Sequence, residues 1–391
     1  MQPQTTLSYR SEALLRLQKK LNITKICNSE RDKDPAYAMD IPQEIGLKLS
    51  NRCNLRCTHC FQWNEEGYHN HLGKGELAKA GDLDIEIVRR LLAETSEVKS
   101  HLYVWGGEPM IYGYWEEFIE LLANDPRQTV ICTNGLLIKR ELDSLIRISD
   151  CLTMLVSIEG LDEIHDKLRG KNTFRKTIDN IQALIDLQKA GIYKGFISVA
   201  GVLSDDLIPE LYETCLYFEE LGIDTLYFNF PWFIDHETAC DMDRFFNNHF
   251  SWMNTGQGAK NSWHSFDFHL NPTLRNDLLE QMAKIKDRKW NIRIRFQPDL
   301  EDSEIKGFIE GANAPCEKRS RCLSISNRID LMPNGNVVPC KKFPEFVVGN
   351  MKGQSLKSVW HGEDFKKFRA THNNTLMPIC SKCELLYSNG V

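Results

Sequence analysis

Three cysteines occur in one short stretch with the spacing CxxxCxxC, at Cys53, Cys57 and Cys60. Thiolate sulfur holds iron-sulfur clusters, and four thiolates usually close a four-iron cluster. Three thiolates leave one iron with an open position, where a substrate or cosubstrate can bind. The spacing therefore predicts a cluster that takes part in chemistry.

A second group of cysteines lies near the end of the chain, at Cys316, Cys322, Cys340, Cys380 and Cys383. The sequence Pro-Asn-Gly at 333–335 separates two apolar runs and is a strong turn signal, so we expect a hairpin that brings Cys322 toward Cys340. The CxxC spacing of Cys380 and Cys383 lets both thiolates reach one metal or cluster. A four-thiolate site of Cys322, Cys340, Cys380 and Cys383 is therefore predicted here.

Structural zinc is the alternative for both groups, because zinc also binds four thiolates or a mixture of cysteine and histidine. His59, His69 and His71 are available to complete a zinc knuckle with the first group. Of the remaining cysteines, Cys132, Cys151 and Cys215 lie in apolar surroundings and are expected to be small buried side chains.

The composition is that of an ordinary globular protein, with 391 residues, 42% hydrophobic residues and a net charge of −6. Charges of both signs are interspersed, which argues against a nucleic-acid groove or a polybasic membrane anchor. No apolar run approaches the roughly 18 residues that span a bilayer, and the first residues do not resemble an export signal. We expect a cytoplasmic protein whose 13 cysteines do not form disulfides, and metal ligation by the two cysteine groups is the better account of so many cysteines.

Short apolar runs alternate with amphipathic stretches from residue 45 onward, which is typical of repeated β/α units around a parallel sheet. The expected strands are 45–49, 101–105, 129–133, 153–158, 195–202 and 225–230, and the expected helices between them are 84–97, 114–123, 140–148, 173–190 and 207–221. The predicted fold class is α/β, with a partial (β/α)6 TIM-like barrel. Ligands in such sheets bind at the carboxyl ends of the strands.

Polar residues follow three successive expected strands. The second strand is followed by Gly-Gly-Glu-Pro at 106–109, the third by Thr-Asn-Gly at 133–135, and the fourth by Ser157 and Glu159, with Arg169 further on. The glycines let main chain approach a ligand closely, and a guanidinium suits a carboxylate ligand. Taken singly, Thr-Asn-Gly is only a turn and Arg169 a solvated side chain.

The cysteine loop, with the aromatic Phe61 directly after its third cysteine, resembles the signature loop of radical S-adenosylmethionine (SAM) enzymes. The resemblance implies that the three cysteines bind a [4Fe-4S] cluster whose open iron chelates SAM, and that one electron cleaves SAM to a 5'-deoxyadenosyl radical. The residues implied to contact SAM are Phe61, Gly106, Gly107, Glu108, Pro109, Asn134, Ser157, Arg169 and Val202. Val202 could equally belong to the barrel core.

The C-terminal cysteines resemble the SPASM and twitch branch of this family, in which Cys322, Gly335 and Cys340 match a C-x(9-15)-G-x(4)-C segment. In that branch a cysteine-rich module binds auxiliary [4Fe-4S] clusters. The resemblance also implies that Cys316 competes with one of the other four cysteines, because some relatives supply a ligand at its position. No cysteine follows Cys383, so the shorter twitch form with one auxiliary cluster is expected.

The expected domain organisation has four parts. Residues 1–40 form an N-terminal arm with a helix around 11–21, residues 41–235 the partial barrel, residues 236–314 a helical and loop connection, and residues 315–391 a small α+β module. The N-terminal arm is expected to pack on the main domain, and a strand at 291–296 to lead out of the barrel.

The resemblance implies hydrogen abstraction from a C–H bond, with electrons from a flavodoxin or ferredoxin. A ribosomally made peptide is the favoured substrate, a small aminocyclitol or sugar-like molecule is the alternative, and a non-catalytic zinc or iron-sulfur scaffold is the alternative of another class. Sulfatase-maturing relatives carry Asp after the cysteine that matches Cys340, whereas this chain has Lys341. The candidate proton-transfer groups are Glu159, Tyr68, His69 and Lys341.

Overall fold

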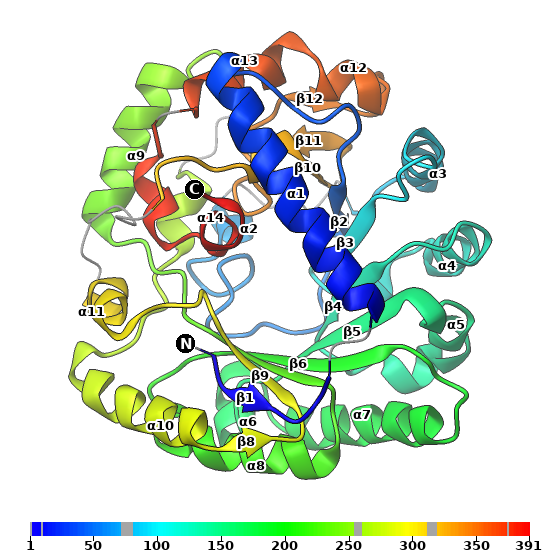
Figure 1. Cartoon of the computed structure of the whole chain (residues 1–391), viewed down its shortest axis with the longest axis vertical. Coiled ribbons are helices and arrows are strands. Elements are labelled where there is room, and N and C mark those ends of the chain that lie inside the picture. The colour runs from blue at the N-terminus through cyan, green and yellow to red at the C-terminus, as the bar shows by residue number, and fades with distance from the viewer. Residues whose placement is uncertain (1, 9–10, 72–80, 254–259, 311–318, 374) are drawn as a thin grey trace.

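The computed structural model describes residues 2–8, 11–71, 81–253, 260–310, 319–373 and 375–391. Its centre is a ten-stranded sheet with the strand order β12-β11-β10-β2-β3-β4-β5-β6-β7-β9 (Figure 1). The predicted strands are present as β2 (Glu44–Ser50), β3 (His101–Gly106), β4 (Thr129–Thr133), β5 (Leu152–Ser157), β6 (Phe196–Val202) and β7 (Thr225–Asn229). Each of these strands pairs in parallel with the next.

Helices cover the outer side of this curved sheet, as Figure 1 shows. They are α3 (Ile85–Glu94), α4 (Trp115–Asn124), α5 (Leu142–Arg147), α7 (Thr173–Lys189) and α8 (Leu211–Leu221). Side chains alternate along the strands: Leu47, Val104 and Ile131 are fully buried in the layer shared with the helices, and alternate positions face the interior. The predicted partial barrel is confirmed, and in the described residues the sheet stays open with β12 and β9 at its ends.

Two segments that were not expected in the sheet extend it. The strand expected to lead out of the barrel is β9 (Arg293–Gln297), which pairs in parallel with β7. At the other end, β10 (Arg328–Leu331) pairs in parallel with β2. Both pairings cover strand edges that would otherwise have unpaired main-chain groups.

The predicted C-terminal hairpin is present. Strand β10 pairs antiparallel with β11 (Asn336–Val338), and β11 with β12 (Gly349–Asn350). Gly335 in the turn has φ +83°, a conformation that glycine adopts without strain. The hairpin that carries Cys340 is therefore continuous with the barrel sheet.

The N-terminal segment packs against two distant parts of the chain, the C-terminal region and strand β8 (Lys289–Trp290). Helix α1 (Ser11–Lys33) is longer than the expected 11–21, and its Cys27 packs with Leu323 of the C-terminal region. Arg31 is fully buried and donates hydrogen bonds to the carbonyl oxygens of Cys322 at 2.7 Å and Arg369 at 3.0 Å. Strand β1 (Gln4–Thr5) pairs with β8. The last turns of α1 are mostly polar in sequence. Their contacts with the C-terminal region explain why the helix continues beyond the expected end at residue 21.

The remaining helices are α2 (Tyr68–His71), α6 (Asp162–Arg169), α9 (His236–His249), α10 (Arg275–Asp287), α11 (Asp302–Glu310), α12 (Leu356–Trp360), α13 (Glu363–Thr371) and α14 (Glu384–Asn389). Short 3-10 turns include η1 (Pro109–Ile111) and η8 (Pro378–Lys382). Within the described ranges, we find no helix with the length and apolarity needed to cross a membrane.

Candidate active site

The cysteine loop begins directly after β2, at the carboxyl end of the sheet. Cys57 is buried, Cys53 and Cys60 are half-buried, and all three are free thiols. Burial raises the pKa of Cys57 to about 12; nearby Arg169 opposes this rise, and the neighbouring thiolates of Cys60 and Cys53 add to it. The three sulfurs thus repel one another when ionised, and a bound cationic iron core would relieve that repulsion.

The Gly-Gly-Glu-Pro segment after β3 is hydrogen-bonded to the start of this loop. The N–H of Gly107 donates to the Ser50 oxygen at 2.9 Å, and the N–H of Glu108 donates to the Arg52 oxygen at 2.8 Å. A Cβ on Gly107 would lie 1.9 Å from the Arg52 oxygen, and one on Gly106 2.5 Å from the Ser50 oxygen. The close main-chain approach predicted for a ligand is therefore made with the cysteine loop itself.

Glu108 connects two strand ends to each other. Its buried carboxylate accepts hydrogen bonds from the Thr133 hydroxyl and the Asn134 N–H, both at 2.8 Å, and it caps η1, which Pro109 opens. Burial raises the pKa of Glu108, although these hydrogen bonds oppose the rise. The Asn134 amide donates to the Asn54 side chain at 2.7 Å. Glu108 and Asn134 thus hold the cysteine loop against β3 and β4.

Glu159 and Arg169 form a buried ion pair beside Cys57. The Arg169 guanidinium contacts Glu159 Oε1 at 2.5 Å, His59 Nε2 lies 3.3 Å from the same oxygen, and the Val202 N–H donates to Oε2. Burial alone would raise the pKa of Glu159, but the charges of Arg169 and His59 hold it well below its usual range. Glu159 is therefore an ionised carboxylate with partners on both oxygens.

Helix α6, whose last residue is Arg169, was not among the expected helices. The signal was available, because Asp162 and Glu163 lie in its first turn and Lys167 in its last, which suits the helix dipole. Arg169 Nη1 lies 3.9 Å from the Cys57 sulfur. Its side chain is 11% exposed, so it is not the solvated arginine of the alternative interpretation. Ser157 is half-buried at the end of β5.

Lys48 is a functional candidate that sequence reasoning missed. It lies on β2 with its side chain 1% exposed, and its ammonium donates to the Tyr68 hydroxyl at 2.8 Å. Burial lowers the pKa of Lys48 to about 7, opposed by the Cys60 thiolate. Burial also raises the pKa of Tyr68 well above its usual value and lowers that of His69 to about 2. Tyr68 is thus protonated and His69 neutral near pH 7, and their catalytic roles stay predictions.

Phe61 and Lys342 connect the cysteine loop to the C-terminal region. Phe61 stacks on Phe266 at 4.4 Å, and the Lys342 ammonium lies 5.6 Å from the Phe61 ring and 4.5 Å from the Trp232 ring. Lys342 is mostly buried, with 15% of its side chain exposed, and lies 3.9 Å from Glu384 Oε2.

Lys341 and Glu384 form an ion pair between two cysteine-bearing segments. The Lys341 ammonium lies 2.9 Å from Glu384 Oε1 and 4.6 Å from the Tyr103 ring. Lys341 follows Cys340, and Glu384 follows Cys383. The candidate proton-transfer group Lys341 is therefore already engaged by a carboxylate, and its catalytic role stays a prediction.

The four described C-terminal cysteines gather in one buried region. Burial raises the pKa of Cys322, Cys340, Cys380 and Cys383, and repulsion among the thiolates adds to the rise for the last three. Main-chain N–H groups also point at the sulfurs, among them those of residues 324 and 325 at Cys322 and 342 at Cys340. Such N–H donors stabilise thiolates, so these residues fit a thiolate-bound cluster. Cys316 lies outside the described residues.

In the described part of the chain, no three His, Cys, Asp or Glu side chains are grouped for one metal ion.

Comparison with known proteins agrees with this donor chemistry. Residues 47–215 match the Radical SAM superfamily, and residues 322–384 match SPASM, an iron-sulfur cluster-binding domain. The chain is a radical SAM enzyme of the SPASM branch. Its radical SAM domain binds a [4Fe-4S] cluster and SAM, and its SPASM domain binds auxiliary iron-sulfur clusters. The expected single auxiliary cluster and the expected domain boundaries stay predictions.

Several maturation enzymes are similar to this radical SAM enzyme. A serine-type anaerobic sulfatase-maturating enzyme of Bacteroides thetaiotaomicron is 24% identical over 86% of this chain and 79% of its own length. The subtilosin biosynthesis protein AlbA of Bacillus subtilis is 22% identical over 82% of this chain and 60% of its own. The crystal structure of Streptococcus suis SuiB covers 98% of this chain and 79% of its own, with a TM-score of 0.58 and 17% identity, which supports the fold.

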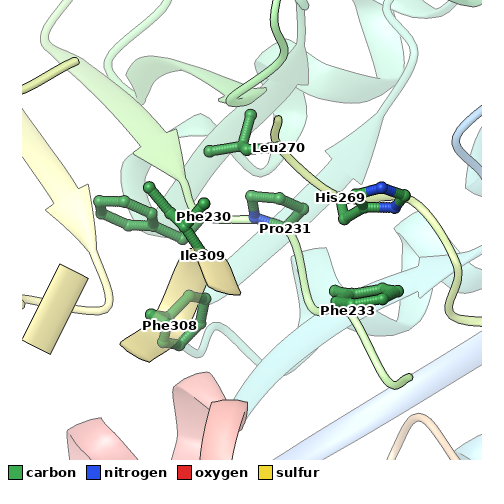
Figure 2. A pocket seen from close by; sticks show the side chains of 7 residues that line it. All are labelled: Phe230, Pro231, Phe233, His269, Leu270, Phe308 and Ile309. Carbon is green, nitrogen blue, oxygen red and sulfur yellow. The ribbon is translucent and has the colours of Figure 1, made fainter. Parts of the chain in front are cut away.

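A small apolar pocket lies at the end of β7 (Figure 2). It is lined by Phe230, Pro231, Phe233, His269, Leu270, Phe308 and Ile309. The aromatic residues of the run 228–233 lie in three different surroundings. Phe230 and Phe233 line this pocket, Trp232 contacts Lys342, and Phe228 is buried in the core.

Proposed function

We propose that this radical SAM enzyme modifies a ribosomally made peptide by crosslinking, epimerising or oxidising one of its residues. Support comes from relatives whose names record such work, namely the bacteriocin protein AlbA and the mycofactocin maturase MftC of Mycobacterium ulcerans. The SuiB structure in complex with its precursor peptide SuiA covers 92% of this chain with a TM-score of 0.56. That likeness supports a scaffold able to present a peptide.

The contacts of Lys342 indicate where the substrate would bind. Its ammonium touches the ring of Phe61, which follows the SAM-cluster ligand Cys60, and it approaches Glu384, which follows the auxiliary-cluster ligand Cys383. A substrate at Lys342 and Trp232 would lie between the two cysteine groups. The aromatic rings there provide apolar surface for side chains of a peptide.

The bound groups supply the hydrogen-abstracting radical from SAM and an auxiliary electron acceptor. Cys53, Cys57 and Cys60 would hold the first cluster, and Cys322, Cys340, Cys380 and Cys383 the second. The SAM contacts proposed for this chain are Phe61, Gly106, Gly107, Glu108, Pro109, Asn134, Ser157, Arg169 and Val202. Among these, Glu108 and Arg169 have internal partners, so we assign them to shaping the site around SAM.

Sulfatase maturation is a less suitable activity for this chain, despite the similarity to a sulfatase-maturating enzyme. Relatives of that kind have an acidic base where this chain has Lys341, and Lys341 is paired with Glu384 at 2.9 Å. An ammonium held by a carboxylate does not accept a proton, which leaves the position without its base. We further propose a flavodoxin or ferredoxin as electron donor and a cytoplasmic location.

The test is an anaerobic assay of the reconstituted enzyme with SAM, dithionite and each short peptide encoded near its gene, analysed by mass spectrometry. We expect one peptide to change mass in step with 5'-deoxyadenosine release, and no change with the Cys53→Ala/Cys57→Ala/Cys60→Ala variant. Release of 5'-deoxyadenosine that is stimulated only by cyclitols or sugars would replace the peptide proposal with the small-molecule alternative.

A further inference from the structure

Lys48 is a buried amine without a carboxylate partner in the described residues, and because burial lowers its pKa to about 7, a nearby negative charge is needed to hold it as the ammonium ion. Its ammonium contacts the Tyr68 hydroxyl at 2.8 Å and His69 Nε2 at 3.5 Å. The rings of Tyr68 and Trp105 lie 5.3 Å and 5.4 Å from it. Hydroxyl, imidazole and aromatic faces solvate an ammonium only in part. A buried charge of this kind is costly unless an anion lies nearby.

The cysteine loop lies next to Lys48, because the ammonium donates to the Tyr68 hydroxyl at 2.8 Å and the ring of Phe61, the residue after Cys60, lies 6.0 Å from the Tyr68 ring. The chain after Cys60 turns back over the ammonium, since the Tyr68 N–H donates to the Phe61 oxygen at 3.0 Å. Leu47 and Leu49, on either side of Lys48 in β2, are fully buried in the main core. Lys48 therefore faces the barrel interior on the strand that leads into the cysteine loop.

Two further hydrogen bonds fix the position of the ammonium. The Tyr68 hydroxyl donates to Gln62 Oε1 at 3.2 Å, and Gln62 Nε2 donates to the Gly106 oxygen at 3.2 Å. Lys48 is thus joined through Tyr68 and Gln62 to the Gly-Gly-Glu-Pro segment. The ammonium cannot move away from the cysteine loop without breaking this series.

We propose that Lys48 is the counter-charge of the SAM-binding cluster and raises its reduction potential. It is a positioning residue, because it acts through the cysteine loop and touches no reacting atom. Reduction moves one electron from an external donor such as dithionite onto the cluster, with no bond made or broken. The cluster becomes more negative, so a fixed ammonium stabilises the reduced form more than the oxidised form. This inference is independent of the substrate.

The experiment compares wild type with Lys48→Met, which keeps the length of the side chain and removes its charge. Anaerobically reconstituted full-length proteins are titrated with dithionite and followed by electron paramagnetic resonance, using the part of the reduced signal that changes on SAM addition. We expect Lys48→Met to have about a tenfold lower ratio of reduced to oxidised cluster at equal potential, which corresponds to about 59 mV for one electron. Lys189→Met, at an exposed position in α7, is the control and should match wild type.

A Lys48→Met protein with full iron content and the wild-type potential would overturn the proposal. If Lys48→Met binds too little iron to titrate, iron and sulfide content are compared in Lys48→Arg and Lys48→Gln. Recovery of iron in Lys48→Arg alone supports a charge requirement. Equal iron loss in both variants would show that the loop needs the shape of lysine and not its charge, which contradicts the proposal.

Discussion

The guanidinium of Arg169 binds a single oxygen of Glu159, with Nη2 at 2.5 Å and Nε at 3.0 Å from Oε1. The other oxygen of Glu159 accepts the N–H of Val202 at the end of β6. This pair joins the ends of β5 and β6 to the last residue of α6, directly beside Cys57. The wall of the expected SAM site is thus held by one buried ion pair.

Replacement of Glu159 with Gln should therefore destabilise the protein strongly. Arg169 would be left buried without its counter-charge, and loss of one partner of a buried pair costs about 3–5 kcal/mol of unfolding free energy. Anaerobic denaturant titration of the reconstituted protein measures the change. Glu213→Gln, at an exposed position in α8, is the control and should stay within about 0.5 kcal/mol of wild type. A loss for Glu159→Gln no larger than this would contradict the importance of the pair.

Gly107→Ala should damage the SAM-cluster site while leaving the auxiliary site intact. The new Cβ would overlap the Arg52 oxygen, and overpacking of this kind costs about 1–3 kcal/mol. We expect less iron in the SAM cluster and slower SAM cleavage. Gly353→Ala is the matched control, because no atom lies within 4 Å of a Cβ at that position. Equal iron and activity in the two variants would show that the loop adjusts to the added methyl group.

The two cysteine groups should load iron separately. Wild type is expected to hold about eight irons, and the Cys53→Ala/Cys57→Ala/Cys60→Ala protein about four with no SAM cleavage. Iron and acid-labile sulfide analysis measures this directly. Zinc in place of iron would refute the assignment of both groups, and SAM cleavage that survives the triple change would refute the assignment of the first group.

The Lys341–Glu384 pair predicts a pH dependence. Burial alone would raise the pKa of Glu384, but the charges of Lys341 and Lys342 have the larger effect and lower the pKa to about 2. Because an unfolded glutamate titrates near 4.3, the pair stabilises the fold above about pH 4.3, and this is lost as pH falls toward 2. The carboxylate is one-third exposed, so solvent screening reduces the effect to about 1–2 kcal/mol.

Lys341→Ala should remove most of this stabilisation at pH 7 and little of it at pH 2, where the pair contributes little to the wild type. Urea titration of the cluster-free chain at both pH values measures the difference, since acid destroys clusters. Lys167→Ala, which breaks the exposed pair with Asp206, is the control and should change stability by less than about 1 kcal/mol at either pH. Equal losses at both pH values for Lys341→Ala would indicate packing and not charge.

The strands of the barrel could be predicted because their signal is local. Apolar residues flanked by turns and amphipathic stretches fixed β2 to β7 to within about two residues. The pairing of β10 with β2 and the full length of α1 depend on residues about three hundred positions apart, such as Arg31 and Cys322. No local pattern contains that information.

The site divides in the same way. The iron-sulfur cluster could be predicted from the spacing of Cys53, Cys57 and Cys60, because the spacing of ligands within one loop can be read from the sequence. The internal partners of Glu108 and Arg169 are tertiary and could not be predicted. Lys48 had a signal that was not used: it is the one charged residue in the run 45–49, directly before the cysteines.

The pairing of β2 with β10 has a consequence for assembly. Glu44 and Arg328 are in register, so the strand before the SAM-cluster loop gains one of its two neighbours only after 284 further residues have been synthesised. Contacts of such sequence separation form late, because closing a long loop precedes any gain from pairing. The nascent chain therefore presents the first cysteine group on a sheet with an unprotected edge. Delivery of iron is best timed to the release of the completed polypeptide, and a truncated translation product should be a poor recipient.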